Sequence, residues 1–195
     1  LAFLQDERLS IYVTLGGLAL ALFTAGMNVA ASTVVSREGQ TFWIAKMIPV
    51  SPKQQVMGKY INVFSISEIG ILVTTVLLAV FLKISLVKIL VIIILGTLGS
   101  IPLTALNMLI DVLHPKLVWN NPQEAMKQNT NGFFGMLASM LVLCVFAGIT
   151  ILLLVNGVSE WLTYIVLGAV MCVGSVLSLK GLFAVAERQY KKIEV

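Results

Sequence analysis

Glu68 is the one carboxylate inside a long apolar stretch of this chain, and Ser65 and Ser67 lie beside it. A charged side chain at membrane depth is costly, so such a residue is a candidate for a proton or substrate path. A second interpretation is open because Glu68 follows Ile61 by only seven residues. If the span begins near Ile66, Glu68 lies at the membrane interface, and we favour this interpretation. No second acid, His or Lys lies inside a span as a relay partner, which weakens the case for a proton-coupled carrier.

The other reactive residue types form no recognisable catalytic or metal site. His114 stands beside Pro115 in a polar stretch, and we interpret it as a surface residue. Cys144 and Cys172 lie in the middle of apolar stretches, where a thiol is usually a small packing residue. The sequence contains no G-x-x-x-x-G-K-[ST] phosphate loop. We therefore expect this chain to have no catalytic activity, no ATPase of its own, no metal and no cofactor.

Five apolar stretches must position these residues, and they cover residues 9–33, 61–82, 89–110, 132–156 and 161–179. Each reaches or nearly reaches the roughly 20 residues with which a helix crosses about 30 Å of hydrocarbon. Because lipid offers the backbone no hydrogen-bond partners, these stretches must be helical. Only 11% of the residues are charged, against about 25% in soluble domains, which excludes a soluble protein. The sequence thus predicts an all-α polytopic transmembrane bundle that forms one domain over residues 1–195.

The basic residues are distributed unequally between the two sides of the predicted bundle. Three precede span one or lie between spans two and three: Arg8, Lys83 and Lys88. The other ten lie in segments 34–60 and 111–131 and in the tail 180–195: Arg37, Lys46, Lys53, Lys59, Lys116, Lys127, Lys180, Arg188, Lys191 and Lys192. Since Lys and Arg near span ends remain cytoplasmic, we expect these segments in the cytoplasm and the amino end outside.

The start of the chain and two features of the spans carry further expectations. Residues 1–10 lack the features of a signal peptide, so we expect a fragment whose parent protein has earlier membrane helices. Gly17, Ala21 and Ala25 recur every four residues and predict a face on which another helix packs closely. Pro102 removes one backbone hydrogen bond from the third span and should kink it.

The segment between spans one and two predicts a short interfacial helix followed by a new helix start. Residues 41–48 include Phe42, Trp43, Ile44, Met47 and Ile48, which can lie along a membrane surface while Lys46 faces water. Pro49 then ends the helix. Ser51 is a suitable N-cap, Pro52 suits the first helical position and Gln54 can close a capping box.

The segment between spans three and four follows a similar pattern, with Asn121, Pro122 and Glu124 as the predicted cap, proline and capping acid. Both segments therefore present ordered short helices on the same side of the membrane. Such helices suit the docking of a partner protein, although they can also simply seal the bundle at the interface.

At these residues the chain resembles the ABC-2 type permeases, the membrane subunits of bacterial ATP-driven exporters, in their long Gram-positive branch. The first set that carries the resemblance is Ser36-Arg37-Glu38-Gly39, Phe42-Trp43, Lys46 and Pro49-Val50-Ser51-Pro52-Lys53. The second set is Asp111, Pro115-Lys116-Leu117, Trp119, Asn121-Pro122-Gln123-Glu124-Ala125 and Lys127-Gln128-Asn129. With their flanking spans, these sets cover roughly residues 9 to 180. Members of that branch are considerably longer, which fits a piece of a larger protein.

The resemblance implies a permease that works with a separate ABC ATPase subunit and with a second permease half or a second copy, surrounded by membrane lipid and without nucleic acid. In the family, short cytoplasmic helices transmit motion from the nucleotide-binding subunit to the membrane helices. By position, the segment 41–48 has this role here, with Phe42 and Trp43 as anchors and Arg37, Glu38 and Lys46 as polar contacts. The transported substrate is not readable from the sequence.

Two other functions remain open from the sequence. An ion-coupled or proton-coupled secondary carrier needs intramembrane charges or broken helices in corresponding halves of the chain, and only Glu68 and Pro102 qualify. A membrane scaffold or sensor that transports nothing is the other alternative. Co-purification of an ATPase subunit distinguishes the exporter from both.

Overall fold

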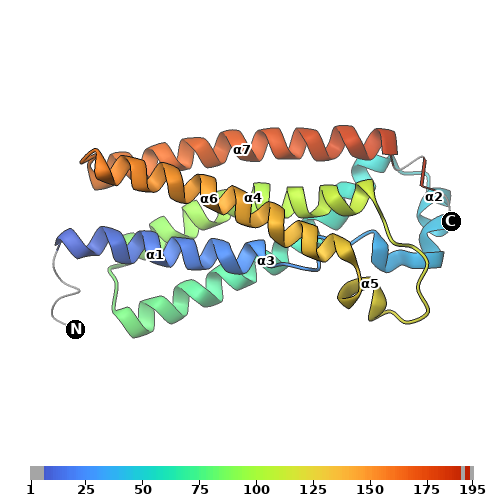
Figure 1. The fold of residues 1–195 in the computed structure, drawn as a ribbon, viewed down its shortest axis with the longest axis horizontal. Coiled ribbons are helices and arrows are strands. Elements are labelled where there is room, and N and C mark those ends of the chain that lie inside the picture. Colours follow the sequence, from blue (N-terminus) through green and yellow to red (C-terminus); the bar gives the residue numbers. More distant parts are fainter. Residues whose placement is uncertain (1–6, 190–191, 194–195) are drawn as a thin grey trace.

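A computed structural model describes residues 7–189 and 192–193, and within these residues the fold is entirely helical (Figure 1). In chain order the elements are α1 (Glu7–Gly26), the 3-10 helix η2 (Ser36–Thr41), α2 (Phe42–Met47), α3 (Pro52–Leu82), α4 (Leu86–Leu113), α5 (Glu124–Lys127), α6 (Thr130–Val155) and α7 (Glu160–Gln189). The long helices run along one elongated bundle. This arrangement confirms the predicted all-helical class.

Among the described residues, four helices are long and apolar enough to cross a membrane, namely α3, α4, α6 and α7. The predicted count of five spans is therefore not confirmed. The predicted first span, residues 9–33, is not one helix. The apolar part of α1 is limited to Ser10–Gly26, and residues 27–35 form turns.

Polar side chains explain why α1 ends at Gly26 although the apolar sequence continues. The Asn28 side chain accepts a hydrogen bond from the Ala30 amide and donates to the Val63 carbonyl oxygen of α3, at 3.1 and 2.9 Å. Ser32 and Thr33 donate their hydroxyls to the Val29 carbonyl oxygen. Such bonds compete with the helical backbone pattern. Residues 31–36 are buried, so this part of the irregular backbone is covered by protein.

The helix α3 begins at Pro52, nine residues before the predicted start of span two. The predicted capping box is confirmed: the Ser51 hydroxyl accepts from the Gln54 amide, and the Gln54 side chain accepts from the Ser51 amide. Pro52 occupies the first helical turn, where its missing N–H costs nothing. The second predicted cap is reproduced in part: the Asn121 side chain accepts from the Gln123 amide at 3.0 Å, whereas Glu124 accepts from the Asn120 amide at 3.3 Å and α5 begins only at Glu124.

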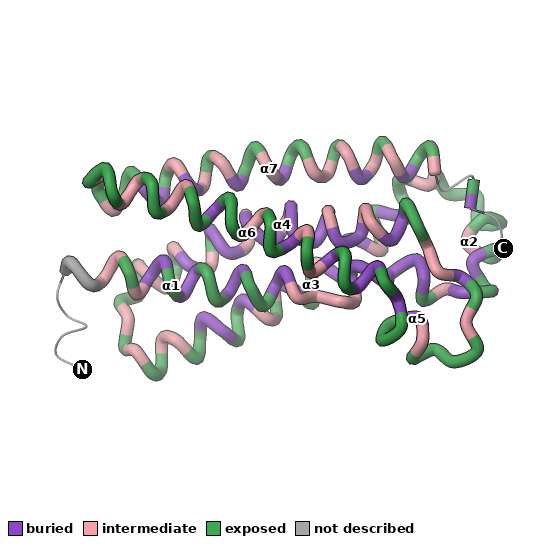
Figure 2. Tube along the Cα trace, in the orientation of Figure 1, coloured by how far each residue is buried: buried purple, intermediate pink, exposed green. Residues whose placement is uncertain are grey.

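The helix α4 lies in the middle of the bundle and contacts α1, α3, α6 and α7. Figure 2 shows many buried residues along it, concentrated from Ile92 onward, whereas α6 exposes much of its length. The helix continues through Pro102 to Leu113, so the proline does not divide it.

The predicted small-residue face of α1 is confirmed. Gly17, Ala21 and Ala25 are all buried, and the two alanines pack with Ile71 of α3 and Ile92 of α4. A Cβ atom at Gly17 would lie 3.0 Å from a methyl carbon of Leu78. The absence of a side chain thus allows α1 to approach α3 and α4 closely.

The two ends of the bundle differ in their connections (Figure 1). One end carries α2, α5 and the end of α7, and we call it the loop end. The other carries the α3–α4 and α6–α7 connections, and we call it the hairpin end. At the hairpin end Lys88 pairs with Glu160 at 3.3 Å. The predicted tail 180–195 instead continues α7 to Gln189, and Lys191 and residues 1–6 lie outside the described part of the chain.

Candidate functional sites

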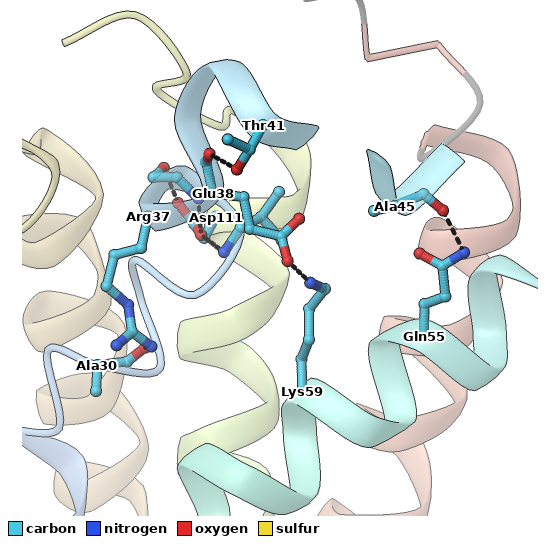
Figure 3. Close-up of polar contacts among 10 residues, drawn as sticks. Ala30, Arg37, Glu38, Thr41, Ala45, Gln55, Lys59 and Asp111 are labelled. Carbon is cyan, nitrogen blue, oxygen red and sulfur yellow. Dashed lines mark hydrogen bonds and ion pairs between the residues drawn. The ribbon is translucent and has the colours of Figure 1, made fainter. Parts of the chain in front are cut away.

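Asp111 connects three segments of the chain at the loop end. It belongs to the last turn of α4 and is fully buried. Its Oδ2 atom accepts hydrogen bonds from the Val35 and Ser36 amides at 2.6 and 3.0 Å. Its Oδ1 atom accepts from the Ser36 hydroxyl and, at 2.9 Å, from the Asn131 side-chain amide of α6. One carboxylate therefore fixes η2 and the start of α6 against the end of α4. Figure 3 shows Asp111 beside η2.

Trp119 fixes the second loop on the first. Its indole N–H donates to the Ser36 carbonyl oxygen at 3.0 Å, and the Lys116 amide donates to the Ser36 hydroxyl at 2.9 Å. The indole ring lies against Gly39, where a Cβ atom would be 2.5 Å from the ring carbon Cζ2. Gly39 also has a φ of 52° and a ψ of −135°, a backbone conformation that residues with a side chain rarely adopt. The two loops that carry the family resemblance thus form one hydrogen-bonded junction, which we call the loop junction.

The helix α2 follows the loop junction, in agreement with the helix predicted for residues 41–48. Its predicted anchors have different positions. Phe42 is fully buried in the core at the loop end, so its ring does not offer a docking surface. Trp43 is 52% exposed and Met47 is 73% exposed, with Ile44 and Ile48 exposed beside them. Only Trp43 of the two aromatic residues is available at the surface.

The three charged residues predicted as polar contacts all bind within the chain, and Figure 3 shows two of them, Arg37 and Glu38. The Arg37 guanidinium donates to the Ala30 carbonyl oxygen at 3.2 Å. Glu38 forms an ion pair with Lys59 of α3. Lys46 donates to the Ile193 carbonyl oxygen near the end of the chain. These contacts hold η2 and α2 on the bundle, while Arg37 and Lys46 remain exposed.

A cavity of about 480 Å³ separates α2 from the first turns of α3. Ile44, Ala45 and Ile48 line one side, and Gln54 and Gly58 are among the residues that line the other. The Gln55 side chain crosses between the two helices and donates to the Ala45 carbonyl oxygen at 2.8 Å (Figure 3). The exposed apolar side of α2 therefore lies beside a hollow at the loop end.

Glu68 forms a second polar site, halfway along the bundle. It is the seventeenth residue of the 31-residue helix α3, and its carboxylate contacts Thr97 and Ser100 near the middle of α4. Both hydroxyls donate to the carboxylate at 2.7 Å. The sequence also predicts a helix start at Ser51 and Pro52, ahead of the apolar span, so the start of α3 does not decide between the two interpretations of Glu68. Both the interfacial and the intramembrane interpretation stay predictions.

A polar stripe runs along α4 and is not among the sites predicted from the sequence. Five polar residues alternate at spacings of three and four and so share one helix face: Thr97, Ser100, Thr104, Asn107 and Asp111. Thr104 contacts Ser67 of α3 at 3.3 Å, and Asn107 donates to Ser139 of α6 at 2.7 Å. The spacing is visible in the sequence, but Asp111 was assigned to a loop although it continues the helical period beyond Ile110.

The remaining reactive residues are isolated. His114 is exposed, as predicted, and its carbonyl oxygen accepts from Asn131. Cys144 and Cys172 are free and exposed on the bundle surface. Within the described residues, His, Cys, Asp and Glu nowhere gather in a group of three or more that could hold a metal ion.

No protein-family model, no curated protein and no solved structure matches this chain.

Proposed function

We propose that this chain is the membrane-spanning permease subunit of an ATP-driven exporter and that a separate nucleotide-binding subunit docks on α2. The proposal rests on the resemblance of the two loops to ABC-2 type permeases and on the way in which those loops are built. ATP hydrolysis takes place in the partner, and a second permease half or a second copy completes the pathway.

The observation that carries the proposal is the exposed apolar side of α2. Trp43, Ile44, Met47 and Ile48 are exposed together on a helix whose other contacts hold it on the bundle. Apolar patches on a fixed element, next to a hollow, are typical of protein interaction sites. Aromatic side chains in such patches commonly supply much of the binding free energy.

The loop junction connects this docking site mechanically to the membrane helices. The chain runs from α2 through η2 to Ser36, and Ser36 is bound to Asp111 on α4. Because α4 contacts every other long helix, a displacement of α2 reaches the whole bundle through one buried hydrogen-bond network. Asp111 is thus a positioning residue in this proposal.

Substitution of Trp43 tests the docking site. We expect Trp43→Ala to weaken association with the ATPase subunit by roughly thirtyfold, which corresponds to about 2 kcal/mol. Trp161→Ala is the matched control, because Trp161 is 60% exposed at the hairpin end. Both variants are compared with the parent chain for ATPase co-purification and for thermal unfolding in detergent.

The pattern of results separates docking from sealing of the membrane interface. Docking predicts that Trp43→Ala loses the partner while its unfolding temperature remains near that of the parent. An interfacial sealing helix predicts lower insertion or lower thermal stability with the ATPase still bound. Retained partner binding by Trp43→Ala rules out Trp43 as the anchor.

The proposal also places the loop end in the cytoplasm and the amino end of the chain outside, on the basis of the basic residues in the loops. A cysteine at Gln54, in a chain without Cys144 and Cys172, should remain unlabelled by an impermeant thiol reagent in intact cells. A cysteine at Ser85, on the hairpin end, should be labelled. The reverse pattern would invert the proposed orientation.

Glu68 favours one second candidate function, a carrier coupled to ions or protons. Its position halfway along α3 is the kind of site that such carriers use. The two functions differ in their source of energy. Transport that stops when ATP is depleted supports the exporter, whereas transport that stops only when an uncoupler removes the proton gradient supports the carrier.

A further inference from the structure

The Glu68 carboxylate has no cationic partner among the described residues. Their two ion pairs are elsewhere: Lys59 with Glu38 at the loop end and Lys88 with Glu160 at the hairpin end. Lys59 is nine residues before Glu68 on α3, which places it about 13 Å away along the helix axis. Among the described residues, the Glu68 carboxylate therefore binds the hydroxyls of Thr97 and Ser100 and no cation.

Glu68 is also partly exposed, and its surroundings on the bundle surface are largely apolar. Ile61 and Leu72, each within two turns of Glu68 on α3, are exposed, and so is Ile94 on α4. Ser65 adds one exposed hydroxyl. An ionised carboxylate facing lipid tails in this way is unfavourable, and such residues normally face a polar path or a partner group. A positive group from outside the described part of the chain would offset this cost.

The two hydroxyls fix the direction of the carboxylate. Each carboxylate oxygen accepts one hydrogen bond, from Thr97 or from Ser100, and each keeps a lone pair for a further donor or cation. A fixed negative charge with apolar surface on both sides complements a molecule that has one positive group and a bulky apolar body. Inorganic cations lack the apolar part, and anionic amphiphiles are repelled.

We propose that Glu68, held by Thr97 and Ser100, binds the positive group of organic amphipathic cations that enter from the bilayer. The proposal rests on the proposed function, and it names the substrate class of the permease. Glu68 contacts the ligand, and Thr97 and Ser100 are positioning residues. The apolar residues beside Glu68 contact the body of the ligand.

Binding of tetraphenylphosphonium to the chain in nanodiscs of zwitterionic lipid tests this site directly. Empty nanodiscs give the background from partition into lipid. Tetraphenylborate is the matched probe, because it has nearly the same size and shape and carries a negative charge. We expect saturable binding of tetraphenylphosphonium and no saturable binding of tetraphenylborate.

Variants then locate the site. Glu68→Gln should weaken tetraphenylphosphonium binding at least about tenfold, and Glu68→Asp, which keeps the charge, should retain the preference for the cation. Thr97→Val and Ser100→Ala should each weaken binding a few-fold. Glu160→Gln is the control for net charge, because it removes a carboxylate at the hairpin end and should bind as the parent does. Each variant is used only if it elutes as the parent does in size-exclusion chromatography.

The proposal is overturned if the parent chain shows no saturable binding of the cation, or if Glu68→Gln and the parent bind it equally. Equal binding of the cation and the anion also overturns it, since the charge of Glu68 then does not select the ligand. The assay contains no ATPase subunit. Failure of partner docking on α2 therefore leaves this result unaffected, and the two proposals fail separately.

Discussion

Asp111 and Glu68 lie on neighbouring helices of one bundle, yet their carboxylates are satisfied in different ways. Asp111 is fully buried and accepts bonds from two backbone amides, a hydroxyl and a side-chain amide. Glu68 is partly exposed and accepts from two hydroxyls. The donors to Asp111 come from segments far apart in the sequence. Removal of its carboxylate therefore breaks the contact between these segments. The donors to Glu68 are both on α4, and each of its carboxylate oxygens keeps a lone pair for a further partner.

This comparison assigns the two acids different roles. A buried carboxylate whose acceptor sites are filled by the protein stabilises the native arrangement. A partly exposed carboxylate halfway along an apolar helix, with no cation bound to it among the described residues, fits the ligand site proposed above. We therefore expect substitutions at the loop junction to change folding stability most, and substitutions at Glu68 to change binding most.

The largest effect on stability is expected for Asp111→Ala. The change leaves the Val35 and Ser36 amides and the Asn131 side chain buried without their acceptor, and each such group costs about 1–3 kcal/mol. We expect a loss of at least about 3 kcal/mol in unfolding free energy, measured by denaturant titration in detergent. Asp111→Asn retains one acceptor oxygen and should lose less. A stability of Asp111→Ala equal to that of the parent would contradict the role given to the loop junction.

Gly39→Ala should have the next largest effect. The new Cβ atom would strain a backbone with positive φ and collide with the Trp119 ring, which we expect to cost about 1–3 kcal/mol. Gly58→Ala is the matched control, because Gly58 lies inside α3 with open space around it and should be neutral or stabilising by up to about 1 kcal/mol. Thermal unfolding of both variants checks the difference. Equal effects would mean that the contact of Trp119 with Gly39 does not hold the loops together.

Glu68→Gln should have the smallest effect on stability, within about 1 kcal/mol, because a glutamine side chain can still pair with the hydroxyls of Thr97 and Ser100. The same denaturant titration measures the unfolding free energies of Glu68→Gln and Asp111→Ala in parallel. A loss as large as that of Asp111→Ala would show that Glu68 is a structural residue, and the contrast between the two acids would disappear.

Features set by nearby residues were predictable from the sequence. The prediction of the capping box of Ser51 and Gln54 is confirmed, because both partners lie within one helical turn. The helix α2 follows from its own apolar residues and Pro49. The close packing of Gly17, Ala21 and Ala25 follows from their spacing on one face. Each of these depends on residues only a few positions apart.

Features that depend on distant partners were not predictable in this way. The end of α1 at Gly26 depends on the bond from Asn28 to α3, 35 residues later, so hydropathy alone extended the span too far. The inward position of Phe42 depends on the core against which α2 packs. A composition of apolar and charged residues does not indicate which side of a six-residue helix turns inward.

The sequence by itself determined the all-helical class, because long stretches of this hydropathy are typical of a multi-pass membrane protein, in which the backbone finds no partners in lipid. It also determined where several helices begin, and it places ten of the thirteen basic residues in segments 34–60, 111–131 and 180–195. Only the tertiary structure decided that Asp111 binds Ser36, 75 residues away, and that Glu68 meets Thr97 and Ser100 halfway along the bundle. Helix starts and hydropathy are properties of neighbouring residues, whereas these contacts depend on how the packed helices are aligned.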